Sequence, residues 1–427
     1  MARKMKDSGI EWIGLIPQAW AVQRVKNLAD VYTGNSIKDD QKEFYEDPTE
    51  AIPYIATKDI DVTLQTIDFE NGMYVKINDD SFKRAPSQST LLCIEGGSAG
   101  KKIAFIEQDV CFVNKLCCLH SNTEFNKFLY YYFMSPAFTQ LFNSYISGLI
   151  GGVSVKELCN FVITLPPFEE QEQIAMFLDL KCKHIDSVIE KTHAAIEEYK
   201  RLKQSVITQA VTKGICPNRE MKDSGIEWIG EIPKEWVCEK FKYIARVKAN
   251  LVHPDGYGDY QQVSPENIEK GTGKILPCKT VKETGVISDN HLFQKGQILY
   301  SKIRPILNKV AIAPFDGLCS ADMYPIETDI NKYYLLYALL SDSYLVNIRL
   351  ITEDRVKMPK INQEELSNIF FAIPEESEQS EIVAYLDEKT AAIDSLIQKK
   401  EQLITELEAY KKSLIYEYVT GKKEIPT

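Results

Sequence analysis

The sequence lacks several features that would place it in a specialised class of protein. No segment approaches about 18 consecutive apolar residues, so we expect no membrane-spanning helix. The first residues, MARKMKDSGIEWIG, lack the apolar run of a signal peptide. The 10 cysteines form no CxxC pair and the 5 histidines show no metal-ligand spacing, which argues against a zinc site. We therefore expect a globular protein of the cytoplasm whose cysteines are reduced and packed.

Motifs of catalytic proteins are also missing. The turn LPPF at 165–168 resembles the Asn/Asp-Pro-Pro-Tyr/Phe turn of adenine methyltransferases, but leucine at its first position cannot accept a hydrogen bond from the target amine. The segment EGGSAGKK resembles a phosphate-binding loop, but Glu95 replaces the first glycine and Lys102 replaces the Ser or Thr that would hold magnesium. No GxGxxG fingerprint is present. We expect no catalytic site, cofactor or metal.

The formal net charge of −11 argues against indiscriminate nucleic-acid binding, which depends on clustered Lys and Arg. The charge is uneven, however. Residues 21–164 hold 13 basic and 18 acidic side chains, a balance of −5, whereas residues 238–372 hold 17 and 16, a balance of +1. The stretch 295–315 has no acidic residue at all. Any DNA-facing surface must therefore be local.

The chain contains an internal repeat. MKDSGIEWIGLIPQAW at 5–20 returns as MKDSGIEWIGEIPKEW at 221–236, an offset of 216 residues with 13 of 16 positions identical. All 4 tryptophans of the protein lie in these two segments. The Trp and Ile-Pro residues could simply plug a core, but that role alone does not explain why the segment occurs twice.

A second repeat lies at an offset of 208. Its first copy, EEQEQIAMFLDLKCKHIDSVIEK, follows Pro167-Phe168, and its second, ESEQSEIVAYLDEKTAAIDSLIQK, follows Pro374-Glu375. The segment between the two repeats is therefore 8 residues shorter in the second half of the chain (216 less 208). A frame of constant length that carries exchangeable inserts would have this pattern.

Both helical repeats predict a coiled coil. From Leu178 and from Leu386, apolar residues alternate at spacings of four and three, a period of about 3.5 residues that is typical of two long helices packed along one another. Polar residues interrupt this stripe and could set its register: Thr192, Lys400, Lys203 and Lys411. The helices should end near Gly214 and Gly421, since glycine favours a helix C-terminus.

The inserts at 21–164 and 237–372 predict mixed α/β folds. Short alternating runs predict strands, as at 89–94, 102–106 and 297–300. Each insert also contains one aromatic helical stretch, at 125–145 and 333–348, which we interpret as core helix and not as a base-stacking platform. The expected organisation is a first recognition domain, a central helix, a second recognition domain, a C-terminal helix and a tail: 1–164, 165–215, 216–372, 373–420 and 421–427.

Three kinds of segment in each insert could contact DNA. They combine glycine, which lets the backbone approach closely, with basic or amide side chains that bind phosphates and base edges. Each segment alone is more typical of a solvated loop than of a DNA site, but the acid-free run with Arg304 and Asn308, followed by Arg355 and Lys357, favours DNA in the second insert. The candidate contacts are Asn35, Ser36, Lys38, Thr57, Lys58, Ser98, Lys101, Lys102, Gln262, Ser264, Ser301, Lys302, Arg304, Asn308, Lys309, Arg355, Lys357 and Lys360.

The whole chain resembles the specificity subunits of type I restriction–modification enzymes. The resemblance lies in the doubled SGIEWIGxIPxxW, in LPPFEEQEQIAMFLD and its partner IPEESEQSEIVAYLD, and in YSKIRPILNKVAIA with RVKMPKIN. It implies two α/β target-recognition domains, each reading half of a split double-stranded DNA sequence, separated by antiparallel helices that fix the spacer. It also implies binding to two modification subunits, which use S-adenosylmethionine to methylate adenine, and to ATP-consuming restriction subunits. The second copy, IPEESEQSE, departs from the first by losing a Pro and the Phe, so the two docking surfaces could be unequal.

Two other functions compete with this interpretation. The chain could be a coiled-coil scaffold that assembles partners without reading DNA, or an enzyme complete in itself. The missing catalytic motifs argue against the enzyme, whereas the scaffold predicts that substitution of Arg304 and Arg355 leaves DNA affinity unchanged. The target sequence, the spacer length and the assignment of each half-site do not follow from these residues.

Overall fold

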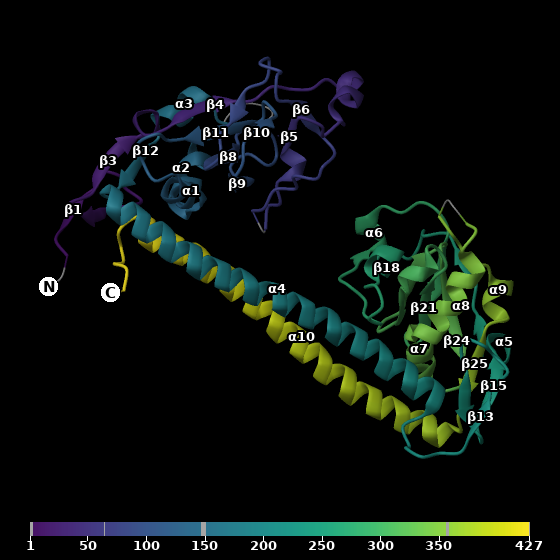
Figure 1. Ribbon diagram of the computed structural model, residues 1–427. Coiled ribbons are helices and arrows are strands. Elements are labelled where there is room, and N and C mark those ends of the chain that lie inside the picture. The colour runs from purple at the N-terminus through teal and green to yellow at the C-terminus, as the bar shows by residue number, and fades with distance from the viewer. Residues whose placement is uncertain (1–2, 64, 147–150, 356–357, 427) are drawn as a thin grey trace. The chain divides into compact units, whose positions relative to one another are not determined.

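The computed structural model describes residues 3–63, 65–146, 151–355 and 358–426. It divides into two compact units: Met1–Thr192 with Glu401–Thr427, and His193–Lys400. Each unit contains one insert and one half of each long helix, α4 (Phe168–Lys213) and α10 (Glu376–Val419) (Figure 1). The mixed α/β class predicted for the inserts is confirmed.

The first insert and its flanking repeat form short strands and helices. In chain order these are β1 Met5–Asp7, β2 Leu15–Pro17, β3 Ala21–Arg24, η1 Val25–Asn27, β4 Asp30–Thr33, η2 Asp39–Tyr45, β5 Ala51–Ile55, η3 Thr57–Asp59, β6 Tyr74–Lys76, β7 Arg84–Ala85, β8 Ser89–Cys93, β9 Ile103–Ile106, β10 Val110–Phe112, β11 Leu116–His120, α1 Asn126–Met134, α2 Pro136–Tyr145, α3 Val155–Asn160 and β12 Val162–Leu165.

The second insert and its repeat follow the same plan. Their elements are β13 Met221–Asp223, β14 Glu231–Pro233, β15 Val237–Lys240, α5 Phe241–Ile244, β16 Ala245–Val247, β17 Leu251–Val252, β18 Gln261–Val263, η4 Pro265–Asn267, β19 Lys279–Thr280, α6 Val281–Thr284, β20 Asn290–Phe293, β21 Ile298–Ser301, η5 Pro305–Leu307, β22 Val310–Ile312, β23 Gly317–Ser320, β24 Met323–Thr328, α7 Lys332–Leu340, α8 Asp342–Thr352, α9 Gln363–Ser367 and β25 Phe370–Ile373.

The two inserts share a topology although their sequences show no repeat. One sheet has the order β4-β11-β8-β9 in the first and β16-β24-β21-β22 in the second, antiparallel throughout. A second sheet contains one parallel pair in each insert, β5 with β10 and β18 with β23. The duplication therefore extends through the whole fold, beyond the segments in which it is visible as sequence.

Each aromatic stretch forms two helices where the sequence predicted one. Ser135 ends α1 and caps α2 by accepting a hydrogen bond from the Phe138 amide, and Pro136 occupies the first turn. Ser341 makes the corresponding break between α7 and α8, where its hydroxyl caps α8 by accepting a hydrogen bond from the Tyr344 amide. Serine favours this break because its hydroxyl satisfies an amide that has no partner within the helix.

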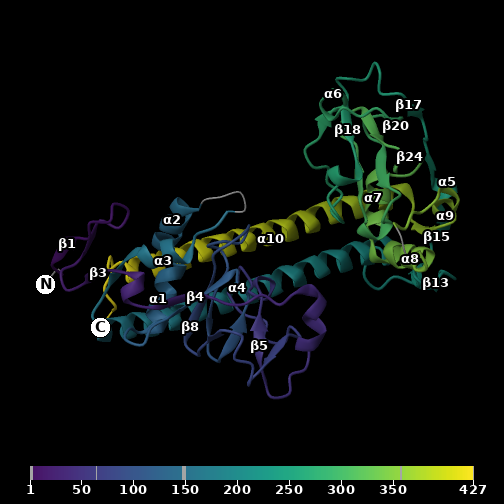
Figure 2. The same cartoon turned by 90° about the horizontal axis from the view of Figure 1, so that it is seen from above.

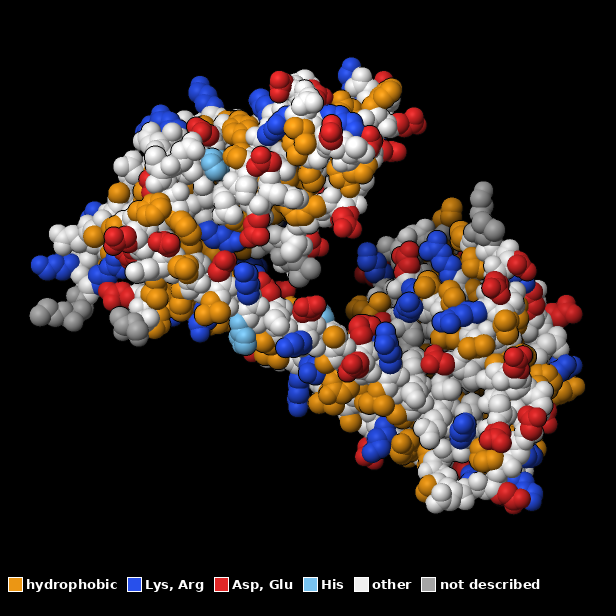
Figure 3. All heavy atoms as spheres, viewed as in Figure 1, with side chains coloured by type: hydrophobic (Ala, Val, Ile, Leu, Met, Phe, Trp, Pro, Cys, Tyr) orange, Lys and Arg blue, Asp and Glu red, His pale blue; other side chains and the backbone are white. Residues whose placement is uncertain are grey.

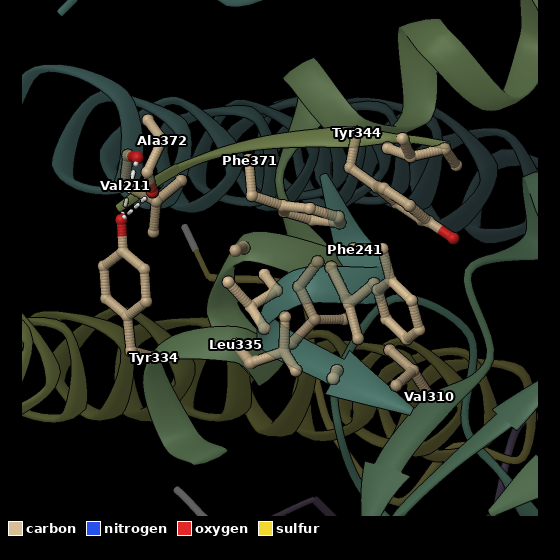
Figure 4. Close-up of a cluster of buried hydrophobic side chains, with 14 of the residues drawn as sticks. Val211, Phe241, Val310, Tyr334, Leu335, Tyr344, Phe371 and Ala372 are labelled. Carbon is tan, nitrogen blue, oxygen red and sulfur yellow. Dashed lines mark hydrogen bonds between the residues drawn. The ribbon is translucent and has the colours of Figure 1, made fainter. Parts of the chain in front are cut away.

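The interpretation of the aromatic residues as core is confirmed. In the second unit Tyr344 stacks on Phe371 with ring centroids 5.8 Å apart, and both lie in one buried apolar cluster (Figure 4). The Tyr334 hydroxyl donates to the carbonyl oxygens of Val211 at 3.2 Å and Ala372 at 2.7 Å. This buried tyrosine thereby joins the end of α4 to β25, so the insert and the helical frame share one core.

Within each unit, the halves of α4 and α10 run antiparallel and lie side by side (Figures 1 and 2). Phe177 contacts Tyr418 in the first unit, and Tyr199 lies beneath the Lys400 ammonium in the second. The predicted stripe is largely buried, for example at Leu178 and Leu386. The predicted ends are also confirmed: Gly214 and Gly421 have φ of +75° and +71°, the left-handed conformation that glycine adopts without strain.

Two equivalent ion pairs interrupt the apolar stripe. Lys411 Nζ contacts both carboxylate oxygens of Asp186 at 2.7 and 2.8 Å in the first unit, and Lys203 Nζ contacts Asp394 Oδ1 at 2.7 Å in the second. Each partner is displaced from its counterpart by the repeat offset of 208 residues. The side chains of Lys203 and Lys411 are only 15% and 14% exposed, so an unpaired ammonium there would be costly. These pairs account for the polar residues at Lys203 and Lys411.

The tryptophan repeats form plugs at the starts of the long helices. Trp20 and Trp236 are each 1% exposed, and their indole nitrogens donate to Glu170 at 3.0 Å and Glu378 at 2.9 Å. Arg3 pairs with Glu170, and Arg219 pairs with Glu378. Since a buried indole N–H and a helix-start carboxylate satisfy each other, this contact explains why Trp and Glu recur together.

Among the residues that the structure describes, no helix is long and apolar enough to cross a membrane.

Candidate nucleic-acid interface

The predicted segment 33–38 is tied to the strands of the first domain. Asn35 N donates to Phe112 O at 2.9 Å, and the Asn35 carbonyl accepts from the Tyr54 hydroxyl at 2.7 Å, where burial raises the pKa of Tyr54 to about 12. A Cβ on Gly34 would lie 1.8 Å from Phe112 O, so only glycine fits there. The Asn35 amide oxygen accepts from Lys83 N, which leaves Ser36 and Lys38 as the exposed side chains of the segment.

The other two predicted segments of the first domain meet each other. Lys102 Nζ donates to the Thr57 carbonyl at 2.7 Å, so this lysine anchors the η3 turn. Lys101 Nζ donates to Gly97 O at 3.1 Å, and Ser98 is half-buried, with its carbonyl accepting from the backbone amides of both lysines. Lys58 is exposed at the rim of an open hollow of about 510 Å³. Three aspartates also line this hollow, which makes its interior unfavourable for phosphate: Asp59, Asp61 and Asp68.

The second domain brings all three of its predicted segments together. Lys309 Nζ donates to the Pro265 carbonyl at 2.7 Å, an anchor equivalent to that of Lys102 in the first domain. Ser264 lies in the same turn, and Gln262 on β18 approaches Asn290 at 3.4 Å. The 301–309 loop is joined to the segment after α8 by the Arg304 N to Pro359 O and Ile361 N to Lys302 O hydrogen bonds.

Arg304 is the exposed arginine of this assembly. Its φ of +44° places it in the left-handed region, and its backbone amide is held by Pro359 O at 2.7 Å. Among the described residues, no hydrogen bond or ion pair occupies its guanidinium, which is therefore available to a ligand. Lys302 lies beside it in sequence, with its ammonium 5.3 Å from the Tyr324 ring centre. A fixed backbone with a free guanidinium is a suitable arrangement for contacting a base edge or phosphate.

Other candidate residues have structural partners. Ser301 and Asn308 are buried, so neither can touch DNA in this conformation, and we leave them out of the proposed contact set. The Arg355 guanidinium pairs with Glu365, holds the pKa of that carboxyl below its usual range and donates to Lys360 O. Lys360 Nζ pairs with Asp322 at 3.0 Å. Lys357 lies outside the described residues.

Sequence reasoning missed the partners that hold this interface. Glu365, Asp322 and Tyr324 each fix a basic residue that the sequence marked as a DNA contact. Glu365 also accepts from the Asn362 amide and caps α9, a pattern that Asn-x-x-Glu could have predicted. No local pattern signals Asp322 or Tyr324, because Asp322 lies 38 residues from Lys360 in sequence and Tyr324 lies 22 residues from Lys302.

No cluster of metal-ligating side chains occurs among the described residues. Two buried cysteines of the sheets are poor nucleophiles, because burial raises the pKa of Cys111 to about 11 and of Cys319 to about 12.

Comparison with known proteins assigns the family. The family model described as type I restriction modification DNA specificity domain matches residues 17–198 and 237–406, and the chain belongs to this family. The resemblance drawn from the motifs is thereby confirmed. Each match covers an insert together with most of the helix that follows it.

Individual relatives agree with this assignment. The EcoDI specificity subunit of Escherichia coli is 32% identical over 255 residues, 56% of this chain and 57% of that protein's length. The MjaVIII specificity subunit of Methanocaldococcus jannaschii is 24% identical over 95% of this chain and 93% of its own.

Solved structures share the fold. A chain of a type I R–M system aligns with a TM-score of 0.73 at 15% identity, covering 96% of this chain and 99% of that one. The HsdS subunit from Thermoanaerobacter tengcongensis aligns with a TM-score of 0.51 at 16% identity, covering 96% and 98%. These structures support the architecture of two α/β domains with two long helices.

Proposed function

We propose that this chain is the DNA-reading subunit of a type I restriction–modification complex. Each recognition domain reads one half of a bipartite, asymmetric double-stranded target, and α4 and α10 set the spacer between the halves. The observation that carries this proposal is one fold present twice with unlike loops. A duplicated fold supplies two equivalent reading surfaces, and unlike loops give them different half-sites.

The chain acts in the cytoplasm as the non-catalytic member of this complex. Two modification subunits supply adenine methylation with S-adenosylmethionine, and restriction subunits supply ATP-dependent cleavage. The relatives named as specificity subunits support this division of labour. Binding of two linked half-sites then gains affinity from their effective concentration, provided that the spacer fits.

Arg304 is the side chain on which we base reading of the second half-site. Basic and acidic side chains are interspersed over the face of each unit that Figure 3 shows, so this face carries no broad positive surface that would bind DNA indiscriminately. Specific reading then depends on single well-placed groups, and an arginine that contacts guanine contributes about 1–3 kcal/mol of discrimination. Ser36 and Lys38, together with Lys58 and Lys101, form the corresponding exposed set of the first domain.

The first experiment defines the target and then alters its spacer. Adenine methylation by the assembled complex is mapped on random DNA to obtain the two half-sites, and binding is measured on that target. Insertion of one base pair between the half-sites should weaken binding at least tenfold, because both domains can no longer engage together. A complex that binds equally well at every spacer length would contradict the proposal and favour a scaffold.

The second experiment compares Arg304→Ala with Arg24→Ala, which removes an exposed arginine from the first unit. We expect Arg304→Ala to cost about 1–3 kcal/mol of binding and to relax base preference in one half-site only. Arg24→Ala should leave that preference intact. If base preference is unchanged in the Arg304 variant, this residue does not read the second half-site.

A further inference from the structure

A short hairpin follows the 3-10 turn in each recognition domain. In the second domain Ile268 pairs with Ile275, and Glu269 N donates to Lys274 O at 3.0 Å. In the first domain Ile60 pairs with Ile67 in the same way. The two hairpins are related by an offset of 208 residues, as are the long helices.

In the second unit the hairpin contacts the long helices at one point and helix α7 of the insert at another. Lys274 Nζ lies 3.6 Å from Asp394 Oδ2, whose other oxygen holds Lys203. Gly273 has a φ of +76°, and a Cβ there would lie 3.3 Å from Leu340 Cδ1 and 3.4 Å from Leu336 Cδ2. The hairpin tip is therefore packed against α7 and tied to the ion pair on the long helices.

The same hairpin also holds the reading loop. Gly271 N donates to the Asn308 carbonyl at 3.0 Å, within the loop that presents Arg304. Lys309 fixes the other end of the turn through Pro265 O. The hairpin thus connects the loop that carries Arg304 with the helices, through contacts on both of its sides.

The equivalent place in the first unit is different. A hollow of about 250 Å³ lies between the hairpin tip and the frame, lined by Val62 and Gln65 on one side and by Met134, Asp186 and Lys411 on the other. Met134 ends α1 as Leu340 ends α7. Thr66 occupies the position equivalent to Lys274 and carries no charge with which to bind Asp186.

We infer that Lys274 is a positioning residue for DNA reading in the second domain. The Ile268–Ile275 hairpin acts as a strut that fixes the 301–309 loop relative to the helices, and Lys274 secures its tip. The position of the reading loop relative to the long helices is consequently more sharply defined in the second unit than in the first. This inference rests on the proposed function, since a spacer has meaning only if the two domains read DNA.

Two matched pairs of variants test the strut. Lys274→Met removes the contact with Asp394, and Lys270→Met removes an exposed charge from the same hairpin that has no ion pair among the described residues. Gly273→Leu forces a side chain against α7, whereas Gly285→Leu imposes a similar backbone strain at φ +63° facing open space, outside the hairpin. Each full-length variant is assembled with its modification subunits and bound to DNA with the native spacer and with one base pair added or removed.

The readout is the ratio of the dissociation constants for altered and native spacers. Lys274→Met should lower this ratio about threefold, as expected for a partly exposed ion pair, and Gly273→Leu should lower it further. The controls should leave it unchanged. Equal ratios in Lys274→Met and the wild type, or equal effects of Lys270→Met, would overturn the inference.

Hydrogen exchange in the free chain tests the contact of the hairpin with the long helices in the absence of DNA. Amides of Glu269 and Gly271 should exchange about threefold faster in Lys274→Met than in Lys270→Met, because the hairpin opens more often. This result does not depend on DNA. A wild-type complex that ignores spacer length would instead contradict the proposed function, whatever the hairpin does, whereas unchanged exchange would contradict the strut.

Discussion

The two recognition domains have one topology and almost no sequence in common. One four-stranded sheet has the same strand order in both, the other sheet gains the edge strand β17 in the second domain, and each domain uses a lysine, Lys102 or Lys309, to anchor the equivalent 3-10 turn. The repeats that flank them, at offsets of 216 and 208 residues, are alike in sequence as well. This contrast shows that the fold requires a few anchors and a buried pattern, whereas the loops that would meet DNA are free to vary.

The domains differ most where they would contact DNA. The second presents the unoccupied Arg304 on a loop braced from several sides, within an insert of balance +1. The first, with a balance of −5, has the exposed Lys58 at the rim of a hollow lined by three aspartates. We therefore expect the second domain to supply the larger electrostatic share of DNA affinity.

The largest expected effect tests whether the two tryptophan plugs contribute equally to the free energy of unfolding. Trp20→Ala and Trp236→Ala each empty a fully buried plug and should each lower the free energy of unfolding by about 3–5 kcal/mol. Urea unfolding followed by circular dichroism measures both. A difference greater than about 2 kcal/mol between the two variants would show that the plugs are equivalent only in appearance.

A smaller effect should distinguish the ion pairs. Asp394 forms ion pairs with both Lys203 and Lys274, whereas Asp186 forms an ion pair with Lys411. Asp186→Asn should cost about 1–2 kcal/mol of unfolding free energy by leaving a largely buried ammonium without its carboxylate, and Asp394→Asn should cost a few tenths more. Thermal unfolding at low and high salt measures both losses. Equal losses would remove the distinction between the units.

The smallest effect comes from giving the first domain the contact it lacks. Thr66→Lys places an ammonium where Lys274 stands in the second domain, within reach of Asp186 by the repeat relation. It should raise stability by at most about 0.5 kcal/mol and increase the penalty for a spacer altered by one base pair. Asn78→Lys, at an exposed position of the same domain outside the hairpin, is the control. An unchanged spacer penalty would mean that a tip lysine alone cannot create a strut.

Much of the frame could be predicted from sequence, because its information is local. The spacing from Leu178 onwards indicates a coiled coil, and the glycines that end both helices follow from backbone chemistry. The shared topology of the inserts could not be predicted, because strands such as β4 and β11 pair across more than 80 residues without a repeated sequence. The break at Ser135-Pro136 was predictable in principle from its capping residues.

The candidate interface was predicted less completely. Basic residues were identified by type, but type does not distinguish a free cation such as Arg304 from one that holds a fold together, such as Arg355 or Lys309. Their partners lie elsewhere in the chain or are backbone carbonyls, which carry no sequence signal. Burial of Asn308 likewise depends on the packing around its loop.

The placement of the tryptophans has a spectroscopic consequence. All 4 lie in the two repeats, and Trp20 and Trp236 each donate to a carboxylate at a helix start. Tryptophan emission therefore reports on the frame and not directly on the inserts. DNA captured by the loops would alter that emission only if the joint between plug and helix moves. The tryptophan fluorescence of the unlabelled protein can thus distinguish a frame that stays rigid on DNA binding from a frame that changes conformation.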